Sequence, residues 1–202
     1  MTKPLLITSN EVLFDSIKKE FKLKQITPIL YEGKCNKKAV AITIVSNSKL
    51  DSTIYLTHLL STSEYSKLII LNPVQCPDTN VLMGQIVVAD SITEWDKSIR
   101  DSRILPLNSL EFKTRVINGK GMSGEKECSN RPTTVLQSKL IDIITYLITK
   151  VAEYFNIPIL SIGIVADHCT VNYEKLLKSN MESLSSRLLE FLKGNSSVLL
   201  EN

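Results

Sequence analysis

Short apolar runs rich in isoleucine and valine alternate along the chain with segments in which apolar residues recur every three or four positions. The runs at 67–71 and 85–89 are nearly all apolar, which is typical of strands buried on both faces. Further strands are predicted at 4–8, 26–31 and 39–45, with a turn at Glu32 and Gly33. This alternation predicts a three-layer α/β/α fold with a mixed central sheet.

Four segments have the periodicity of amphipathic helices. Leu13, Ile17 and Phe21 predict a first helix that ends near residues 22–24. Ser48 is a favourable N-cap for a second helix, whose Leu50, Ile54 and Leu59 are expected to face the sheet. The third and fourth helices are predicted from Thr133 or Thr134 to Phe155, and over 173–192 before Gly194.

Periodicity fades over residues 93–133, where proline and glycine interrupt the chain. Gly119, Gly121 and Gly124 match the GxGxxG pattern of dinucleotide-binding proteins. That motif needs a preceding strand and a helix that opens from it, whereas proline and polar residues follow here. We therefore expect a mobile loop at these glycines and no cofactor.

Composition indicates one domain over residues 1–202, because 202 residues with 43% hydrophobic content can bury one sizeable core. The net charge of +3 is scattered along the chain, which argues against nucleic acid or a membrane as a partner. Four cysteines without a CxxC pair, and two histidines, lack the spacing of a zinc site, so no metal is expected. No apolar run reaches the length of a signal peptide core or a membrane span, so we expect a cytoplasmic protein.

Two runs carry a resemblance to a known family. They are KLIILNPVQCPDTNVLMGQIVVADSITEWD at 67–96 and FNIPILSIGIVADHCT at 155–170. They resemble the nucleoside phosphorylase and nucleosidase superfamily, most closely the methylthioadenosine/S-adenosylhomocysteine nucleosidases. In that family a glycine-rich loop precedes a GDIVVADS-like strand, and a late strand ends in a catalytic aspartate. The resemblance implies cleavage of the N-ribosyl bond of a purine nucleoside by a homodimer.

The resemblance implies roles for two acids. Asp167, at the end of the late strand, matches the general acid of the family; the alternative is that it caps the turn at 169–172. Glu11 matches the glutamate after the first strand, which orients the attacking water. Thr8, Ser9, Asn10 and Glu11 also read as a capping box in which the glutamate returns to the N–H of Thr8.

Other motifs of the family are altered here. Asp142, Ile143 and Ile144 stand where the family has Glu, Met and Glu, so the carboxylate that would bind the ribose hydroxyls is missing. A site built around such bonds loses a factor on the order of ten thousand in discrimination without them. The loop of Asn72, Pro73, Val74, Gln75 and Cys76 replaces the glycine-rich loop as the pocket wall, and Met122 stands near the base-stacking phenylalanine.

The residues 46–49 keep polar groups but lack the glycines of a phosphate-binding turn, which favours hydrolysis over phosphorolysis. The sequence thus predicts a divergent purine nucleosidase that hydrolyses a methylthioadenosine- or S-adenosylhomocysteine-like nucleoside. The alternative is a non-catalytic nucleoside-binding or assembly protein of the same fold. We expect the homodimer to use the helix that begins at Ser48, through Ile54, Tyr55, Leu56 and Leu59.

Overall fold

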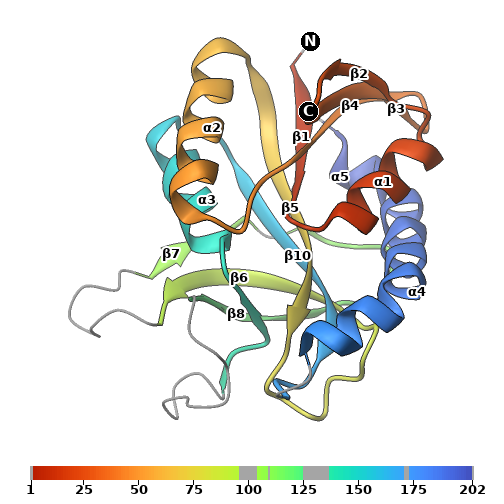
Figure 1. Ribbon diagram of the computed structural model, residues 1–202, viewed down its shortest axis with the longest axis vertical. Helices are drawn as coiled ribbons and strands as arrows, with labels where there is room; N and C mark the ends of the chain where they lie inside the picture. The colour runs from red at the N-terminus through yellow and green to blue at the C-terminus, as the bar shows by residue number, and fades with distance from the viewer. Residues whose placement is uncertain (1, 96–103, 109, 125–136, 171–172, 202) are drawn as a thin grey trace.

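The computed structural model describes residues 2–95, 104–108, 110–124, 137–170 and 173–201 (Figure 1). Within these residues, the strands join one ten-stranded sheet. The strands are β1 (Lys3–Thr8), β2 (Lys24–Thr27), β3 (Leu30–Cys35), β4 (Lys38–Ile44), β5 (Tyr65–Gln75), β6 (Ile86–Glu94), β7 (Leu105–Pro106), β8 (Ile117–Ser123), β9 (Leu140–Asp142) and β10 (Ile159–Asp167). The helices are α1 (Glu11–Glu20), α2 (Lys49–Thr62), α3 (Thr145–Tyr154), α4 (Tyr173–Gly194) and α5 (Ser196–Leu199).

The sheet is open at one end and closed at the other. The open part runs β2-β3-β4-β1-β5, and β1 pairs in parallel with both β4 and β5. Beyond β5, the strands β10, β6, β8 and β9 follow in turn, and β9 pairs back onto β5 through Gln75 and Ile141. Five strands therefore form a small closed ring, which we call the ring, at one end of a mixed sheet.

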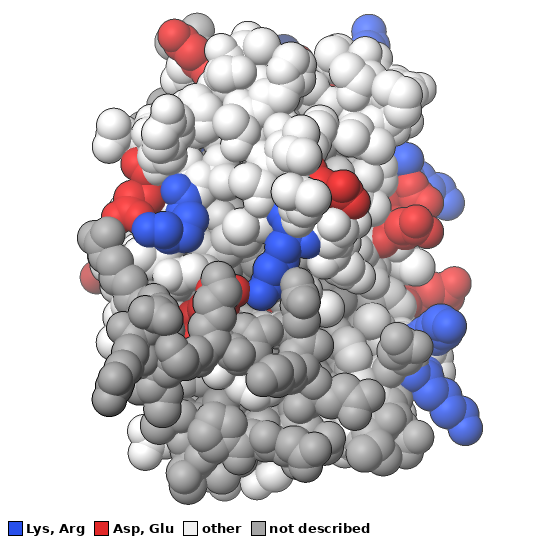
Figure 2. Space-filling view, turned by 60° about the vertical axis from the view of Figure 1, so that its left-hand side comes forward, with Lys and Arg blue, Asp and Glu red and all other residues white. Residues whose placement is uncertain are grey.

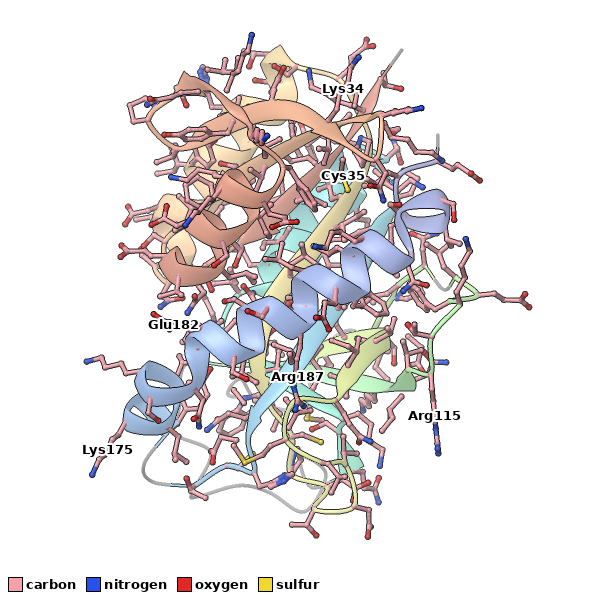
Figure 3. All side chains as sticks on the ribbon, turned by 90° about the vertical axis from the view of Figure 1, so that its right-hand side faces the viewer. Lys34, Cys35, Arg115, Lys175, Glu182 and Arg187 are labelled. Atoms are coloured by element: carbon pink, nitrogen blue, oxygen red, sulfur yellow. The ribbon has the colours of Figure 1, made fainter. Side chains whose placement is uncertain are left out.

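Helices cover the sheet on both faces, which confirms the predicted three layers. In Figure 1, α2 and α3 lie on one face, and α1, α4 and α5 lie on the other. Figure 3 shows α4 lying across the strands, with Arg187 extending toward the loop between β5 and β6. Its guanidinium lies close to Gly84, which has a φ of 78°. None of the described helices is long and apolar enough to cross a membrane.

Each face has its own apolar core. Leu13, Ile17 and Leu188 pack with Ile69 and Ile162 on the face of α1 and α4. The opposite core joins α2 and α3 to the other side of the same strands, and includes Leu56, Leu59, Ile70, Ile148 and Val151. The run at 67–71 lies in β5, which carries apolar side chains toward both cores, as does β10. The other nearly all-apolar run, at 85–89, leads into β6, which lies in the ring between β10 and β8.

Two predictions about the first half of the chain are wrong. Glu32 and Gly33 lie inside β3, and the tight turn falls instead at Asn36 and Lys37, whose φ values of 47° and 70° fit a two-residue hairpin turn. In α2, Ser48 is the N-cap as predicted, but Leu50 and Ile54 point to solvent, with 69% and 62% of their surface exposed.

Three further predictions, two of them in the second half of the chain, are also wrong. Gly119 and Gly121 lie in β8 rather than in a loop, because this segment pairs with β6 over seven registered positions. The predicted helix over 133–155 begins only at Thr145, and Leu140–Asp142 is a strand that completes the ring; Thr133 and Thr134 fall outside the described residues. Asn72 to Gln75 continue β5 as strand and form no loop.

Glycine allows the ring to close at two inward positions. A Cβ on Gly163 would lie 2.6 and 2.7 Å from the methyl groups of Val74 and 3.0 Å from Leu140. A Cβ on Gly121 would lie 2.7 Å from Ile92 Cδ1 and 3.2 Å from the Cβ of Ala89. Real side chains do not approach this closely, so the strands of the ring can pack at this distance only where glycine stands.

We predict that Gly163→Ala lowers the free energy of unfolding by about 1–3 kcal/mol, because the added methyl overpacks the interior of the ring. In a chain of this size the melting temperature should fall by a few degrees, about 2–4 °C per kcal/mol. Gly194→Ala is the matched control, since a Cβ there meets nothing within 4 Å. Equal melting temperatures for the two variants would contradict this role of glycine in the ring. Val74→Ala, added to Gly163→Ala, should restore the lost stability.

Candidate active site

Strand pairing around the ring brings together residues from distant parts of the chain. Met122 pairs with Thr93 and with Ile141, Ile141 pairs with Gln75, and Gln75 pairs with Asp167. The next row holds Glu94, Ser123 and Asp142, also in register. We call these two rows of paired residues, which lie at the ends of their own strands, the rim, and Asp167 within them makes the rim the candidate site.

Asp167 is buried, with 1% of its surface exposed, and its carboxylate accepts three hydrogen bonds. Gln75 Nε2 donates to Oδ2 over 3.1 Å, and the backbone N–H and hydroxyl of Thr170 donate over 2.7 and 2.8 Å. The bonds from Thr170 are those of a turn cap, the predicted alternative. Gln75 is not part of that turn, so it ties the acid to β5 as well.

Glu11 is the first residue of α1, and it is exposed. The predicted capping box is wrong, because Asn10 is the N-cap and its side chain accepts the N–H of Leu13 over 3.0 Å. Thr8 instead accepts the N–H of Asn10. Glu11 forms no hydrogen bond or ion pair with the described residues, so its carboxylate is available to a ligand or a water.

Asn72 holds the turn between β1 and α1. Its Oδ1 accepts the hydroxyl of Thr8 over 3.2 Å, and the N–H and hydroxyl of Ser9 over 2.9 and 3.3 Å. Only 2% of its surface is exposed, and its Nδ2 makes no hydrogen bond of normal geometry with the described residues. Asn72 therefore positions the start of α1, and with it Glu11, relative to β5.

Asp142 is the last residue of β9, and its side chain caps the start of α3, which begins three residues later. Its Oδ1 accepts the hydroxyl of Ser123 over 2.6 Å and the N–H of Thr145 over 3.1 Å, and its Oδ2 accepts the hydroxyl of Thr145. Ser123 in turn accepts the N–H of Tyr146 over 2.9 Å. Burial raises the pKa of the Asp142 carboxyl, and the hydrogen bonds from Ser123, Thr145 and Asn72 offset that effect only in part.

The predicted pocket residues divide into two groups. Met122 is buried at the rim, and Gln75 contacts Asp167. Val74 packs inside the ring, and Ile144 packs in the core between the sheet and α2, with Ile143 partly buried against that same core. Pro73 lies within β5, where its carbonyl accepts the hydroxyl of Tyr173 over 3.5 Å. The structure therefore brings Asp167, Gln75 and Met122 together at the rim, whereas the side chain of Ile144 is buried in the core that joins α2 and α3 to the sheet.

A small apolar cluster at the rim was missed by the sequence analysis. Met122 and Ile141 form it, with Trp95 and Cys169 packed against them. Cys169 belongs to the turn that follows Asp167, so the acid and the cluster are neighbours. Trp95 lies in the segment without periodicity, and only the pairing of β6 with β8 brings it here.

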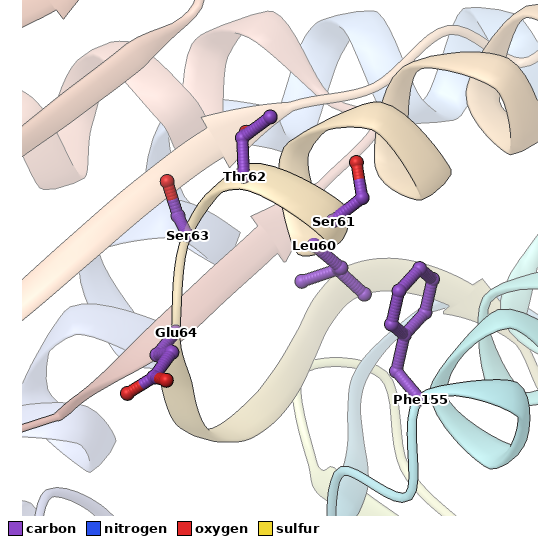
Figure 4. A pocket seen from close by; sticks show the side chains of 6 residues that line it. All are labelled: Leu60, Ser61, Thr62, Ser63, Glu64 and Phe155. Atoms are coloured by element: carbon purple, nitrogen blue, oxygen red, sulfur yellow. The ribbon is translucent and has the colours of Figure 1, made fainter.

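One ion pair and one cavity of the described part of the chain complete the description of the charged and hollow regions. Lys49 of α2 forms an ion pair with the buried Glu94 over 2.8 Å, which fastens α2 to the rim. A cavity of about 540 Å³ lies between the C-terminal end of α2 and Phe155 (Figure 4). Those segments lead into β5 and β10, so this cavity lies at the opposite edge of the sheet from Asp167. Among the described residues, no three His, Cys, Asp or Glu side chains cluster as metal ligands do.

Comparison with known structures identifies the fold. No protein-family model matches the chain, and no curated protein matches its sequence. A futalosine hydrolase mutant from Helicobacter pylori superimposes with a TM-score of 0.82 at 10% identity, covering 96% of this chain and 98% of that one. An MTAN from Chlamydia trachomatis gives 0.77 at 17%, covering 95% and 96%.

A 5′-methylthioadenosine/S-adenosylhomocysteine nucleosidase from S. pneumoniae, solved with a transition-state inhibitor, gives 0.79 at 13%, covering 95% and 98%. The chain therefore has the fold of the nucleoside phosphorylase and nucleosidase superfamily, which confirms the predicted fold class. At these identities the likeness establishes the fold, while the activity has to be argued from the rim.

We predict that burial of the Asp142 carboxyl makes the free energy of unfolding depend on pH. Because its folded-state pKa is raised, the folded protein keeps a proton that the unfolded chain loses, so stability falls as pH rises from about 4 through the folded-state pKa. Asp142→Asn can keep the bonds to Ser123 and Thr145 but cannot ionise. Its stability relative to wild type should rise across that range, by about 1.4 kcal/mol per unit of pKa shift. Urea unfolding at several pH values would measure this, and a constant difference would contradict it.

Proposed function

We propose that this protein is an N-ribosyl hydrolase that cleaves a purine nucleoside of the methylthioadenosine or S-adenosylhomocysteine type. The observation that carries the proposal is the position of Asp167. It ends β10 at the rim, next to an apolar cluster suited to a base, in a fold shared with nucleosidases. The buried carboxylate is oriented from two sides, by Gln75 and by Thr170.

In the proposed reaction, the bond between the base nitrogen and the anomeric carbon breaks as positive charge develops on the sugar. Asp167 carries a proton to the departing purine when substrate is bound, which requires one of its three hydrogen bonds to rearrange. Gln75 is the donor best placed to do so, because it is a flexible side chain whereas Thr170 is part of the turn. Positioned proton transfer of this kind contributes a factor of about 100 to 10,000.

Glu11 orients the attacking water and accepts its proton, which completes the balance of the hydrolysis. The carboxylate is exposed at the first position of α1. The contacts of Asn72 with Thr8 and Ser9 hold this turn against β5, whose end bears Gln75. Asn72 is thus a positioning residue for Glu11, the proposed general base.

The sugar subsite differs from that of the family to which the sequence is similar. Ile144 occupies the position expected for the ribose-binding carboxylate, and it is 1% exposed within the core. Asp142 is already engaged as a cap of α3. Weak discrimination at the ribose hydroxyls, and a low rate, are therefore expected, in line with the loss of designed hydrogen bonds.

The burial of Ile144 at the position expected for the ribose-binding carboxylate also favours a second candidate function. In this function the chain is a nucleoside-binding or assembly protein without turnover. In that case Asp167 is a turn cap, and its contacts with Thr170 are sufficient to explain its burial. The two functions differ in one measurable property, the release of free base from a nucleoside.

We predict that Asp167→Asn abolishes measurable release of adenine from methylthioadenosine. Asparagine cannot supply the proton, but it keeps part of the hydrogen bonding, so the free energy of unfolding should fall by only about 1 kcal/mol. A base-release assay and thermal melts on both proteins would measure this. Release by the variant comparable with wild type would refute the catalytic assignment, whereas no release by either protein would select the second candidate.

Glu11→Gln tests the proposed general base without changing the stability of the folded protein. The side chain is exposed and forms no hydrogen bond or ion pair with the described residues, so the melting temperature should be unchanged while base release falls by a factor on the order of 100. Glu64→Gln is the matched control, because Glu64 is also exposed but lies by the cavity at the other edge of the sheet. Full activity in Glu11→Gln would show that Glu11 is not the general base of the reaction.

We also propose that the chain is a homodimer and that α2 forms the contact. Leu50 and Ile54 are exposed on this helix, and Figure 2 shows mostly uncharged side chains over the upper part of the face that bears it. Leu56 and Leu59 belong to the core of the same chain, and Tyr55 bonds to Thr43 over 2.7 Å. The contact would therefore use Leu50 and Ile54 alone of the apolar residues of α2.

Light scattering at micromolar concentration should show a dimer for the wild type and a monomer for Ile54→Lys, because a buried lysine opposes association. Ile26→Lys, at a residue 57% exposed on β2, should leave the mass unchanged. A monomeric wild type, or a variant that stays dimeric, would remove this interface.

A further inference from the structure

Three lysines surround one carboxylate at the edge of the sheet opposite the rim. Lys38 is the first residue of β4, and Lys67 lies near the start of β5. Because β1 pairs in parallel with both strands, the two lysines lie at the same edge with a single strand between them. The other end of β5 bears Gln75, so this edge is remote from Asp167.

The carboxylate belongs to Glu201, which lies shortly after α5. Lys38 Nζ donates to Glu201 Oε1 over 2.9 Å and to the carbonyl of Ser197 over 3.3 Å. Lys113 comes from a third part of the chain, and its backbone N–H donates over 2.8 Å to Oδ1 of Asn195, the residue directly before α5. The start of β4 and the segments that flank α5 therefore meet at this edge.

The charges at this edge are unbalanced. The pKa of Glu201 is lowered, first by its hydrogen bond from Lys38 and further by the positive charges of all three lysines. Burial lowers the pKa of Lys67, and the nearby charge of Lys38 adds to this effect while that of Glu201 opposes it. Neither Lys67 nor Lys113 forms an ion pair with the described residues. Three ammonium groups against one carboxylate therefore leave two positive charges uncompensated.

Stability alone does not account for this arrangement. A partly buried ammonium beside a second ammonium is unfavourable unless an anion compensates both. The Glu201 side chain supplies one charge and is 67% exposed, so its ion pair with Lys38 contributes little and can be displaced. A phosphate monoester, by contrast, carries about 1.5 to 2 negative charges at pH 7 and has three strong acceptor oxygens.

We propose that Lys38, Lys67 and Lys113, which we call the lysine cluster, form a binding site for a phosphate group. The carboxylate of Glu201 occupies the place that this group takes. Phosphate compensates two of the three ammonium groups, whereas the carboxylate compensates one. The site lies at the other end of β5 from Asp167, so this inference does not rest on the proposed function.

Calorimetric titration with inorganic phosphate, at constant ionic strength with chloride as the balancing anion, tests the site. The wild type should bind phosphate saturably, and its melting temperature should rise with phosphate concentration. Lys67→Met should weaken binding about ten- to a hundredfold, as expected for the loss of one hydrogen bond between charged groups. In chloride alone this variant should melt no lower than the wild type, because it removes an uncompensated charge.

Glu201→Gln should change the affinity in the opposite direction. It removes the competing carboxylate and keeps the size of the side chain, so phosphate should bind several-fold more tightly. A misfolded variant would not give that result. Lys175→Met is the matched control, because Lys175 is an exposed lysine at the start of α4, far from Lys34 and Cys35 in Figure 3. It should bind phosphate as the wild type does.

Glycerol 3-phosphate distinguishes the two sources of a phosphate group. Tighter binding than that of inorganic phosphate supports a site for a small phosphate monoester, and equal or weaker binding supports a site for the free anion. No saturable binding of either probe by the wild type would overturn the inference. Unchanged affinity in Lys67→Met, weaker binding by Glu201→Gln, or an equal rise in melting temperature with chloride would also overturn it.

Discussion

The pairing of β9 with β5 is the constraint on which the rest of the structure depends. It rests on one registered pair, Gln75 with Ile141, and it closes five strands into the ring. Closure requires strands to approach closely, and Gly121 and Gly163 permit this because they have no Cβ. Through closure, the ends of β5, β8, β9 and β10 reach one level, so Asp167, Gln75, Ile141 and Met122 become neighbours.

This closure also explains why polar groups are enclosed at the rim. Asp142 and Ser123 end adjacent strands of the ring, and they satisfy the first N–H groups of α3, which has no side-chain cap of its own at Ile144. This arrangement buries the Asp142 carboxyl, and burial raises its pKa. Asn72 links this group to the first turn, because its oxygen holds the turn before α1 and its side chain also lowers the pKa of the Asp142 carboxyl.

The sequence predicted the layers because apolar periodicity depends on burial, and burial is what the sheet imposes. The central strands β5 and β10 and the cap at Ser48 follow directly from residue type. The hairpin turn was misplaced, because Gly33 is the usual turn residue whereas Asn36 and Lys37 adopt the left-handed conformation here. The start of α3 was misplaced because Leu140 and Ile143 have the spacing of a helix, whereas β9 has only three residues, too few to show the alternation of a strand.

The candidate site was only partly predictable for a related reason. Asp167 lies at the end of an apolar run, and its position can be read from the chain. Gln75 was expected in the pocket wall only from the resemblance. Its contact with Asp167, and the position of Trp95, depend on pairings between segments far apart in sequence, which local patterns do not encode. The contacts of Asp142 depend on the ring in the same way, since Ser123 comes from a segment whose glycines suggested a loop.

The central claim is that the rim of the ring holds a purine base between the Asp167 turn and the apolar cluster. A crystal structure of the protein grown with adenine tests it most directly. The account predicts planar density at the rim, with an edge within hydrogen-bond distance of the Asp167 carboxyl. Adenine bound elsewhere, such as in the cavity beside Phe155, with an unchanged and empty rim, would contradict it.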